Sequence, residues 1–146
     1  MAYVTFQYEA LKKFTLEVFK KMGFNDSESE IISDVLLTSD LYGIESHGMQ
    51  RMVRYYKSAK NGRLVIGAQK EIVHETPLSA VIDGHNGMGQ LLGHYAMNLA
   101  IEKAKKSGVG IVTVRNSNHF GIAGYYAKMA SNEGLFGFAT TNSEAI

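Results

Sequence analysis

Apolar side chains recur at helical spacing through the first 62 residues of the chain. The spacing predicts a first amphipathic helix over residues 8–22. A second helix is predicted to begin at Asp26 or Ser27, where Ser27 and Glu30 have the spacing of a capping box, and to end before Gly43. This first segment is therefore expected to be mainly helical.

A third helix is predicted from Ser46, a suitable N-cap residue, to Lys60. His47, Arg51 and Tyr55 follow one another at four-residue intervals, so they fall on one face of such a helix. That row is expected to point away from the core, because another face carries the apolar side chains Met49, Met52, Val53 and Tyr56. An ordinary solvated helix would show the same pattern. An imidazole, a guanidinium and a phenol on one face can also hold a carboxylate while a proton moves.

Beyond about residue 67 the pattern changes to short apolar runs that alternate with helices. It predicts an α/β (α+β) fold, in which a mixed sheet is joined by crossover helices. We expect a helical N-terminal region over residues 1–67 and the start of an α/β domain over residues 68–146. The predicted strands are 70–76, 78–83, 109–114 and 135–140, and the predicted helices are 88–106 and 122–133.

Composition excludes several classes of protein. The chain has 146 residues, which suits one domain, and its 15 basic and 14 acidic residues leave no basic surface for nucleic acid. It has no cysteine for a disulfide or a thiolate metal site. The histidines lack metal-ligand spacing, so no metal site is proposed. No apolar run is long enough to span a membrane, and residues 1–9 do not form a signal peptide, so we expect a cytoplasmic protein without membrane contacts.

A polar loop over residues 115–121 follows a predicted buried strand. Loops at the carboxyl ends of strands joined by crossovers are common ligand sites. His119 in this loop could accept a proton, since the ordinary pKa of histidine is about 6.5. A helix-capping turn with a solvated histidine is the alternative. Thr141 and Asn142 follow the last predicted strand and could face the same ligand, although such polar strand exits are common.

The glycine-rich segment 84–89 reads G-x-x-G-x-G, which is the reverse of the dinucleotide-binding fingerprint. No acidic residue follows a second strand at the distance that the fingerprint requires. We therefore interpret this segment as a turn.

Two motifs together resemble the malate/L-lactate dehydrogenase family, which includes ureidoglycolate dehydrogenase, diketogulonate reductase and sulfolactate dehydrogenase. The first is Ser46-His47-Gly48 with Arg51 four residues after the histidine, and the second is the run 116–126, NSNHFGIAGYY. The resemblance extends along the whole chain. It implies a non-Rossmann fold, a homodimer, and hydride transfer between NAD or NADP and a small 2-hydroxy or 2-oxo acid.

The resemblance also implies roles for individual residues. His119 matches the proton acceptor, and His47 matches a histidine that donates a proton or polarises the substrate. Arg51 matches the clamp for the substrate carboxylate, and Ser46 matches a polar substrate contact. Ser143 matches a cofactor contact, with Thr141 and Asn142 beside it. Tyr55 is added as a substrate-binding residue from the helical spacing alone.

Members of this family are more than twice as long as this chain. We therefore expect residues 1–146 to be the N-terminal part of such an enzyme, with a sheet that is incomplete after residue 140. A non-catalytic binding or assembly module is the alternative function. A hydrolase that uses His119 as a base is less well supported, because the chain lacks a G-x-S-x-G nucleophile motif.

Overall fold

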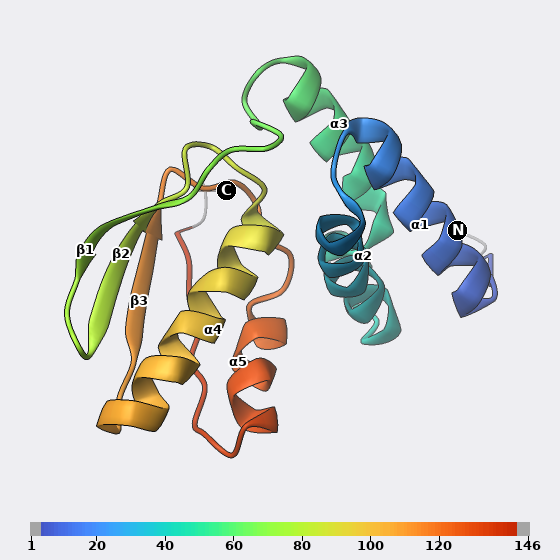
Figure 1. Cartoon of the computed structure of the whole chain (residues 1–146). Helices are drawn as coiled ribbons and strands as arrows, with labels where there is room; N and C mark the ends of the chain where they lie inside the picture. The colour runs from blue at the N-terminus through green and yellow to red at the C-terminus, as the bar shows by residue number, and fades with distance from the viewer. Residues whose placement is uncertain (1–3, 143–146) are drawn as a thin grey trace.

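The computed structural model describes residues 4–142, which form helices first and a small sheet afterwards (Figure 1). Helix α1 (Tyr8–Met22) has the predicted bounds, and it ends at Gly23 in the left-handed conformation. Helix α2 (Asp26–Leu41) also begins where the spacing indicated. Its N-cap is Asn25, however, which forms a capping box with Glu28. The predicted Ser27–Glu30 box is therefore wrong.

The predicted helix from Ser46 to Lys60 is interrupted. Two short 3₁₀ turns, η1 (Glu45–His47) and η2 (Met49–Arg51), come first, and α3 covers only Met52–Lys60. The interruption has a local cause at Gly48, which is extended with φ −88° and ψ −151°. The Asp40 carboxylate accepts a hydrogen bond from the backbone N–H of Met49 at 2.8 Å, so this N–H does not enter a continuous helix.

The sheet has three strands in the order β1-β2-β3. Strands β1 (Glu71–Glu75) and β2 (Ser79–Asp83) are antiparallel, and β3 (Ile111–Arg115) is parallel to β2. Helix α4 (Gly89–Ser107) makes the crossover between the two parallel strands, and α5 (Ala123–Asn132) follows β3 and packs beside α4 (Figure 1). The predicted mixed α/β architecture is therefore confirmed. The division at residue 67 into two domains stays a prediction.

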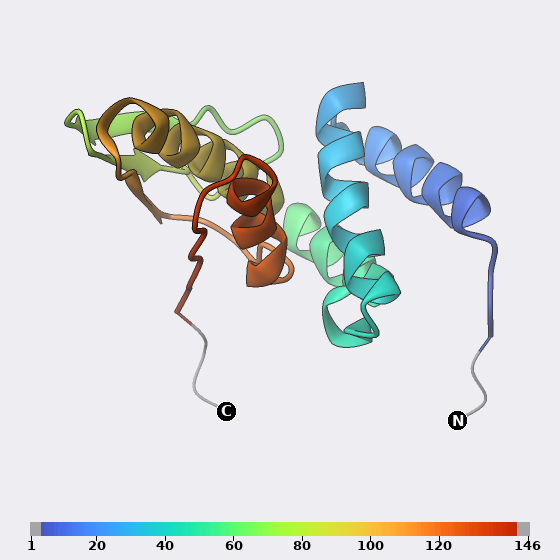
Figure 2. The same cartoon turned by 90° about the horizontal axis from the view of Figure 1, so that it is seen from below.

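The strand predicted over residues 135–140 is not formed in the described part of the chain. The segment is extended, and Phe136 and Phe138 are 95% and 73% exposed, but it pairs with no strand of residues 4–142. It runs close to α5 instead, because a Cβ atom at Gly137 would lie only 2.2 Å from the carbonyl oxygen of Ala127. Figure 2 shows this segment beside α5.

Helix α2 is the centre of the packing. It contacts α1 on one side and α4 on the other, and serines 29, 33 and 39 are buried on it. Tyr55 of α3 belongs to the same core and is only 3% exposed, whereas Val53 and Tyr56 are 60% and 50% exposed. The prediction that Tyr55 points outward while Val53 and Tyr56 face the core is therefore wrong, because the short α3 begins at Met52 and packs in a different rotation.

Candidate active site

The carboxylate of Asp83, at the end of β2, fixes the start of the loop that follows β3. It accepts hydrogen bonds from Arg115 Nε at 2.9 Å and from the side-chain amide of Asn116. The backbone N–H of His85 donates to it as well, at 3.0 Å. The hydrogen bonds from His85 and Asn116, with that from Arg115, lower the pKa of Asp83 to about 2. The ends of the two parallel strands are thus locked to each other.

The Asn118 side chain holds the middle of the same loop. Its Nδ2 donates to the carbonyl oxygens of Asn86 at 2.8 Å and Gly87 at 3.1 Å, and it lies 3.3 Å from the carbonyl oxygen of Arg63. The first two carbonyls belong to the turn after β2, and the third lies beyond α3. This one amide therefore connects the loop to both halves of the described chain and leaves the next residue, His119, in a defined position.

His119 meets two side chains from distant parts of the sequence. Tyr55 Oη of α3 lies 2.8 Å from His119 Nδ1, and Gln90 Nε2, in the first turn of α4, donates to the same Tyr55 oxygen at 2.8 Å. Gln90 is fully buried and Tyr55 nearly so. A polar chain of three side chains thus runs from the core to the loop.

The turn η1 brings a second imidazole to the same place. The ring centroids of His47 and His119 are 5.2 Å apart, and Ser46 Oγ lies 2.9 Å from His47 Nδ1. The Nε of Arg51 donates to the carbonyl oxygen of Ser46, which holds the guanidinium against the turn that carries His47. No carboxylate of residues 4–142 forms a salt bridge with Arg51. Its two Nη atoms are therefore available for an external anion.

Burial and positive charge keep His119 neutral at physiological pH. Desolvation is the main cause of its lowered pKa, and the charges of Arg51, His47 and Arg54 add to the effect, so that the pKa falls to about 4. Desolvation likewise raises the pKa of Tyr55 to about 12, against smaller opposing effects of Gln90, Arg51 and Arg54. Tyr55 is therefore a neutral phenol at any physiological pH.

Two buried polar atoms of this cluster lack a hydrogen-bond partner among the described residues, namely His119 Nε2 and Gln90 Oε1. Buried polar groups are paired in the great majority of cases, so an unpaired one requires an explanation. An open cavity of about 590 Å³ borders the cluster, and Arg54, Tyr55, Asn118 and His119 contribute to its lining. The geometry thus combines an imidazole nitrogen without a partner, a second imidazole and an available guanidinium.

Residues 6–146 match the family model described as malate/L-lactate dehydrogenase. The chain belongs to the malate/L-lactate dehydrogenase family. Malate dehydrogenase of Pyrococcus abyssi is 46% identical over 144 residues, which are 99% of this chain and 40% of that protein. L-sulfolactate dehydrogenase of Methanocaldococcus jannaschii is 46% identical over 133 residues, which are 91% of this chain and 39% of that protein.

Solved structures show the same relationship. The structure of malate dehydrogenase from Pyrococcus horikoshii OT3 has a TM-score of 0.88 at 44% sequence identity, covering 90% of this chain and 38% of that one. The family resemblance found in the sequence is confirmed. The chain spans about 40% of the length of the curated relatives it matches.

The residues predicted for this malate/L-lactate dehydrogenase family site fall into two groups. His47, Arg51, Tyr55 and His119 lie together with Ser46, although His47 and Arg51 occupy 3₁₀ turns and not the continuous helical face expected for them. Of the remaining three, the two that the structure describes do not join them. Thr141 and Asn142 are exposed and have no hydrogen bond to the cluster within the described residues, and Ser143 lies outside those residues.

The glycine-rich turn after β2 packs against the loop after β3 in this family member. In the glycine-rich turn after β2, a Cβ at Gly84 would lie 3.0 Å from the carbonyl oxygen of Asn116, and one at Gly89 would lie 2.2 Å from that of Asn118. These glycines therefore let the chain pack against its own loop. The interpretation of this segment as a turn is consistent with that packing.

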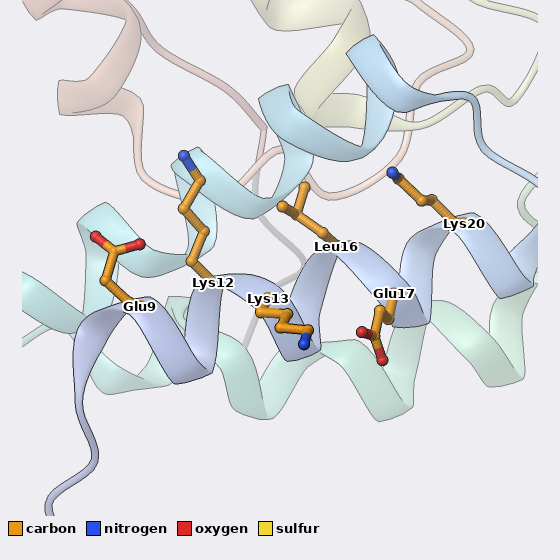
Figure 3. A pocket seen from close by; sticks show the side chains of 6 residues that line it. All are labelled: Glu9, Lys12, Lys13, Leu16, Glu17 and Lys20. Carbon is orange, nitrogen blue, oxygen red and sulfur yellow. The ribbon is translucent and has the colours of Figure 1, made fainter.

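A second hollow lies far from this chemistry, along the outer surface of α1. Figure 3 shows its lining side chains projecting from that one helix. Two of its lysines have carboxylate neighbours, since Lys12 lies 3.4 Å from Glu30 and Lys20 lies 2.9 Å from Asp26. This hollow is a solvated helix surface and offers no catalytic group.

The described residues contain neither a cluster of metal ligands nor a membrane-spanning helix. Residues 4–142 hold no group of three or more His, Asp or Glu side chains that could bind a metal ion. Within the same range, no helix is both long enough and apolar enough to cross a membrane.

Gln90 is the site residue that sequence reasoning missed. It lies in the predicted helix over residues 88–106, beside residues expected to be buried, and its polarity was not interpreted. The available signal was a lone amide at the apolar start of a helix. Asn118 was recognised only as part of the polar loop over residues 115–121, and its three carbonyl partners cannot be inferred from spacing.

Proposed function

We propose that this chain contributes the acid–base and substrate-binding residues of an oxidoreductase that interconverts a small 2-hydroxy acid and its 2-oxo acid. The observation that carries the proposal is the unpaired, buried Nε2 of His119 beside His47 and Arg51. Relatives named malate dehydrogenase and L-sulfolactate dehydrogenase indicate the class of substrate.

Arg51 binds the substrate carboxylate in this proposal. Its Nε is occupied by the carbonyl oxygen of Ser46, so the Nη pair presents two parallel donors to a planar anion. Ser46 lies in the same turn and contributes a polar contact to the substrate. The carboxylate would then lie close to the two histidines.

His119 exchanges the proton of the substrate hydroxyl group. In the oxidation direction, Nε2 accepts the hydroxyl proton while His47 stabilises the oxygen that becomes a carbonyl. In the reverse direction the imidazolium of His119 returns the proton to that oxygen. Tyr55 remains a phenol throughout, because its raised pKa opposes ionisation, and it orients the His119 ring.

The cofactor, quaternary structure and compartment complete the proposal. A nicotinamide dinucleotide, NAD or NADP, supplies the hydride chemistry when bound. Thr141, Asn142 and Ser143 are the proposed contacts of this chain to it. We also propose a homodimer, as the family resemblance implies, and a cytoplasmic location, as expected from the composition.

The test is an assay of the purified protein with malate, lactate and sulfolactate, each with NAD and with NADP, following the absorbance of the reduced nicotinamide. Reduction that is lost in His119→Ala and kept in Tyr56→Phe, a change at an exposed residue of α3, supports the proposal. Activity that survives in His119→Ala, or no reduction with any of these acids, contradicts it.

A further inference from the structure

The direction of the hydrogen bonds around Tyr55 determines where His119 carries its proton. Gln90 Nε2 donates to Tyr55 Oη, so the phenolic hydrogen is free to point at His119 Nδ1, 2.8 Å away. The backbone N–H of Gly121 points at the same nitrogen at 3.3 Å. Nδ1 is therefore an acceptor, and a neutral His119 carries its hydrogen on Nε2.

This arrangement opposes the uptake of a proton by His119. A nitrogen that already carries hydrogen cannot accept a second one, and an imidazolium would direct its Nδ1–H at the hydrogen of Tyr55. The lowered pKa of His119 agrees with a site that disfavours the charged ring. A base at Nε2 requires the opposite tautomer, with hydrogen on Nδ1.

Rotation of the Gln90 amide by a half turn would reverse the whole chain of hydrogen bonds. Gln90 Oε1 has no partner among the described residues, and the only hydrogen bond of its Nε2 is the one to Tyr55. Rotation thus exchanges one unpaired atom of Gln90 for another. The one further contact that is lost is the 3.3 Å contact of the Gly121 N–H with His119 Nδ1, because Nδ1 then carries hydrogen. Tyr55 would then donate to Oε1 and accept from His119 Nδ1–H, which leaves a lone pair on Nε2. Gln90 is fully buried, so water does not compete for either end.

We propose that Gln90 is a positioning residue that sets, through Tyr55, which ring nitrogen of His119 carries the proton. This role of Gln90 rests on the function proposed above for His119. In the observed orientation Nε2–H is a hydrogen-bond donor to a substrate oxygen. In the rotated orientation Nε2 accepts the hydroxyl proton. The O–H bond of the substrate breaks, an N–H bond forms at Nε2, and Nδ1–H keeps its hydrogen bond to Tyr55 Oη. An amide serves both states because it has a donor and an acceptor on the same carbon.

The test measures the tautomer of His119 directly, in the chain labelled with ¹⁵N histidine, by the nitrogen chemical shifts of the ring at a pH well above the pKa of His119. His119→Gln assigns the signals. The native chain should show mainly the Nε2–H form. At a pH high enough to ionise a buried carboxyl, Gln90→Glu should shift the population to the Nδ1–H form, because an ionised carboxylate only accepts hydrogen bonds. Gln69→Glu is the matched control, since Gln69 is exposed and donates only to the carbonyl oxygen of Gly67.

A shift in Gln90→Glu that is absent from Gln69→Glu supports the proposal, and an unchanged tautomer in a folded Gln90→Glu overturns it. Should Gln90→Glu fail to fold, Tyr55→Phe decides, because it removes the hydroxyl link and keeps the ring. In that variant the Nδ1–H population must rise, and an unchanged ratio overturns the proposal. The measurement needs neither substrate nor cofactor. A failed dehydrogenase assay with the expected tautomers would therefore count against the proposed function alone.

Discussion

Replacing Gly48 by alanine tests why the polypeptide breaks between η1 and η2. The backbone of Gly48 has a negative φ that alanine can adopt, so the change adds no conformational strain. A Cβ atom at this position would, however, lie 1.8 Å from Oδ1 of Asp40 and 2.3 Å from its Cγ. The Asp40 carboxylate must move, and its hydrogen bond from the Met49 N–H, now 2.8 Å long, must be lost.

The expected loss of stability follows from these two effects. A hydrogen bond to a charged group contributes about 1.5–3 kcal/mol. Replacing glycine by alanine at a compatible backbone position stabilises the folded state by about 0.4–1 kcal/mol, because it lowers the conformational entropy of the unfolded chain. Gly48→Ala should therefore destabilise the fold by about 0.5–2.6 kcal/mol, or roughly 1–10 °C in Tm for a chain of this size. Gly124→Ala in α5 is the control, because a Cβ there meets nothing within 4 Å, and it should be neutral or stabilising.

Urea denaturation followed by circular dichroism measures both variants, and a double-mutant cycle isolates the contact. In an Asp40→Ala background the obstacle is gone, so Gly48→Ala should stabilise the fold by about 0.4–1 kcal/mol. The coupling free energy between the two sites should then be about 1.5–3 kcal/mol, the contribution of the lost hydrogen bond. A Gly48→Ala variant as stable as Gly124→Ala, or strict additivity with Asp40→Ala, would show that this contact does not determine the break.

Three further predictions concern charge. Arg51→Lys should lower kcat/KM about 10- to 150-fold, equivalent to about 1.5–3 kcal/mol, because an ammonium group lacks the planar Nη pair, and an unchanged value would remove Arg51 from the site. The acid limb of the kcat/KM profile should lie near pH 4, the pKa of His119, and should vanish in His119→Ala; a limb near the ordinary histidine value contradicts the assignment. Asp83 has a folded pKa of about 2 against an ordinary 3.8, so its stabilising contribution is present above pH 3.8 and lost as the pH falls toward 2. Asp83→Asn should therefore flatten the fall in urea stability over that interval, and an unchanged slope would refute the assignment.

Local sequence signals predicted most of the secondary structure. The bounds of α1 follow from strong periodicity and a terminal glycine, and β1 and β2 lie within the predicted strands 70–76 and 78–83. Helix α2 shows the limit of such rules at its N-terminus, because both Asn25 and Ser27 are suitable caps. Only the backbone that enters the helix selects between them.

The failures arise where distant residues decide the local structure. Nothing near Met49 in the sequence shows that Asp40, nine residues earlier, will accept its N–H and end a turn there. Tyr55 was predicted to be exposed because a continuous helix from Ser46 was assumed. The apolar run after Gly134 has the alternation of a strand, but a strand requires a partner that spacing cannot supply.

The sequence predicted which residues belong to the candidate site better than it predicted their arrangement. Arg51 and His119 were identified by motif and chemistry, and they do lie in one cluster. The hydrogen-bond chain from Gln90 could not be predicted, because it joins residues separated by 35 and 64 positions in the sequence. Long-range side-chain contacts of this kind depend on how α3 and α4 pack.

The amide of Asn118 makes the placement of His119 dependent on the relation between the helical segment and the sheet. Its Nδ2 reaches a carbonyl oxygen beyond α3 and two in the turn after β2. Any hinge motion that swings α3 away from the sheet must stretch this bridge or move His119 away from Tyr55. The position of His119 beside Tyr55 therefore depends on how α3 packs against the turn after β2.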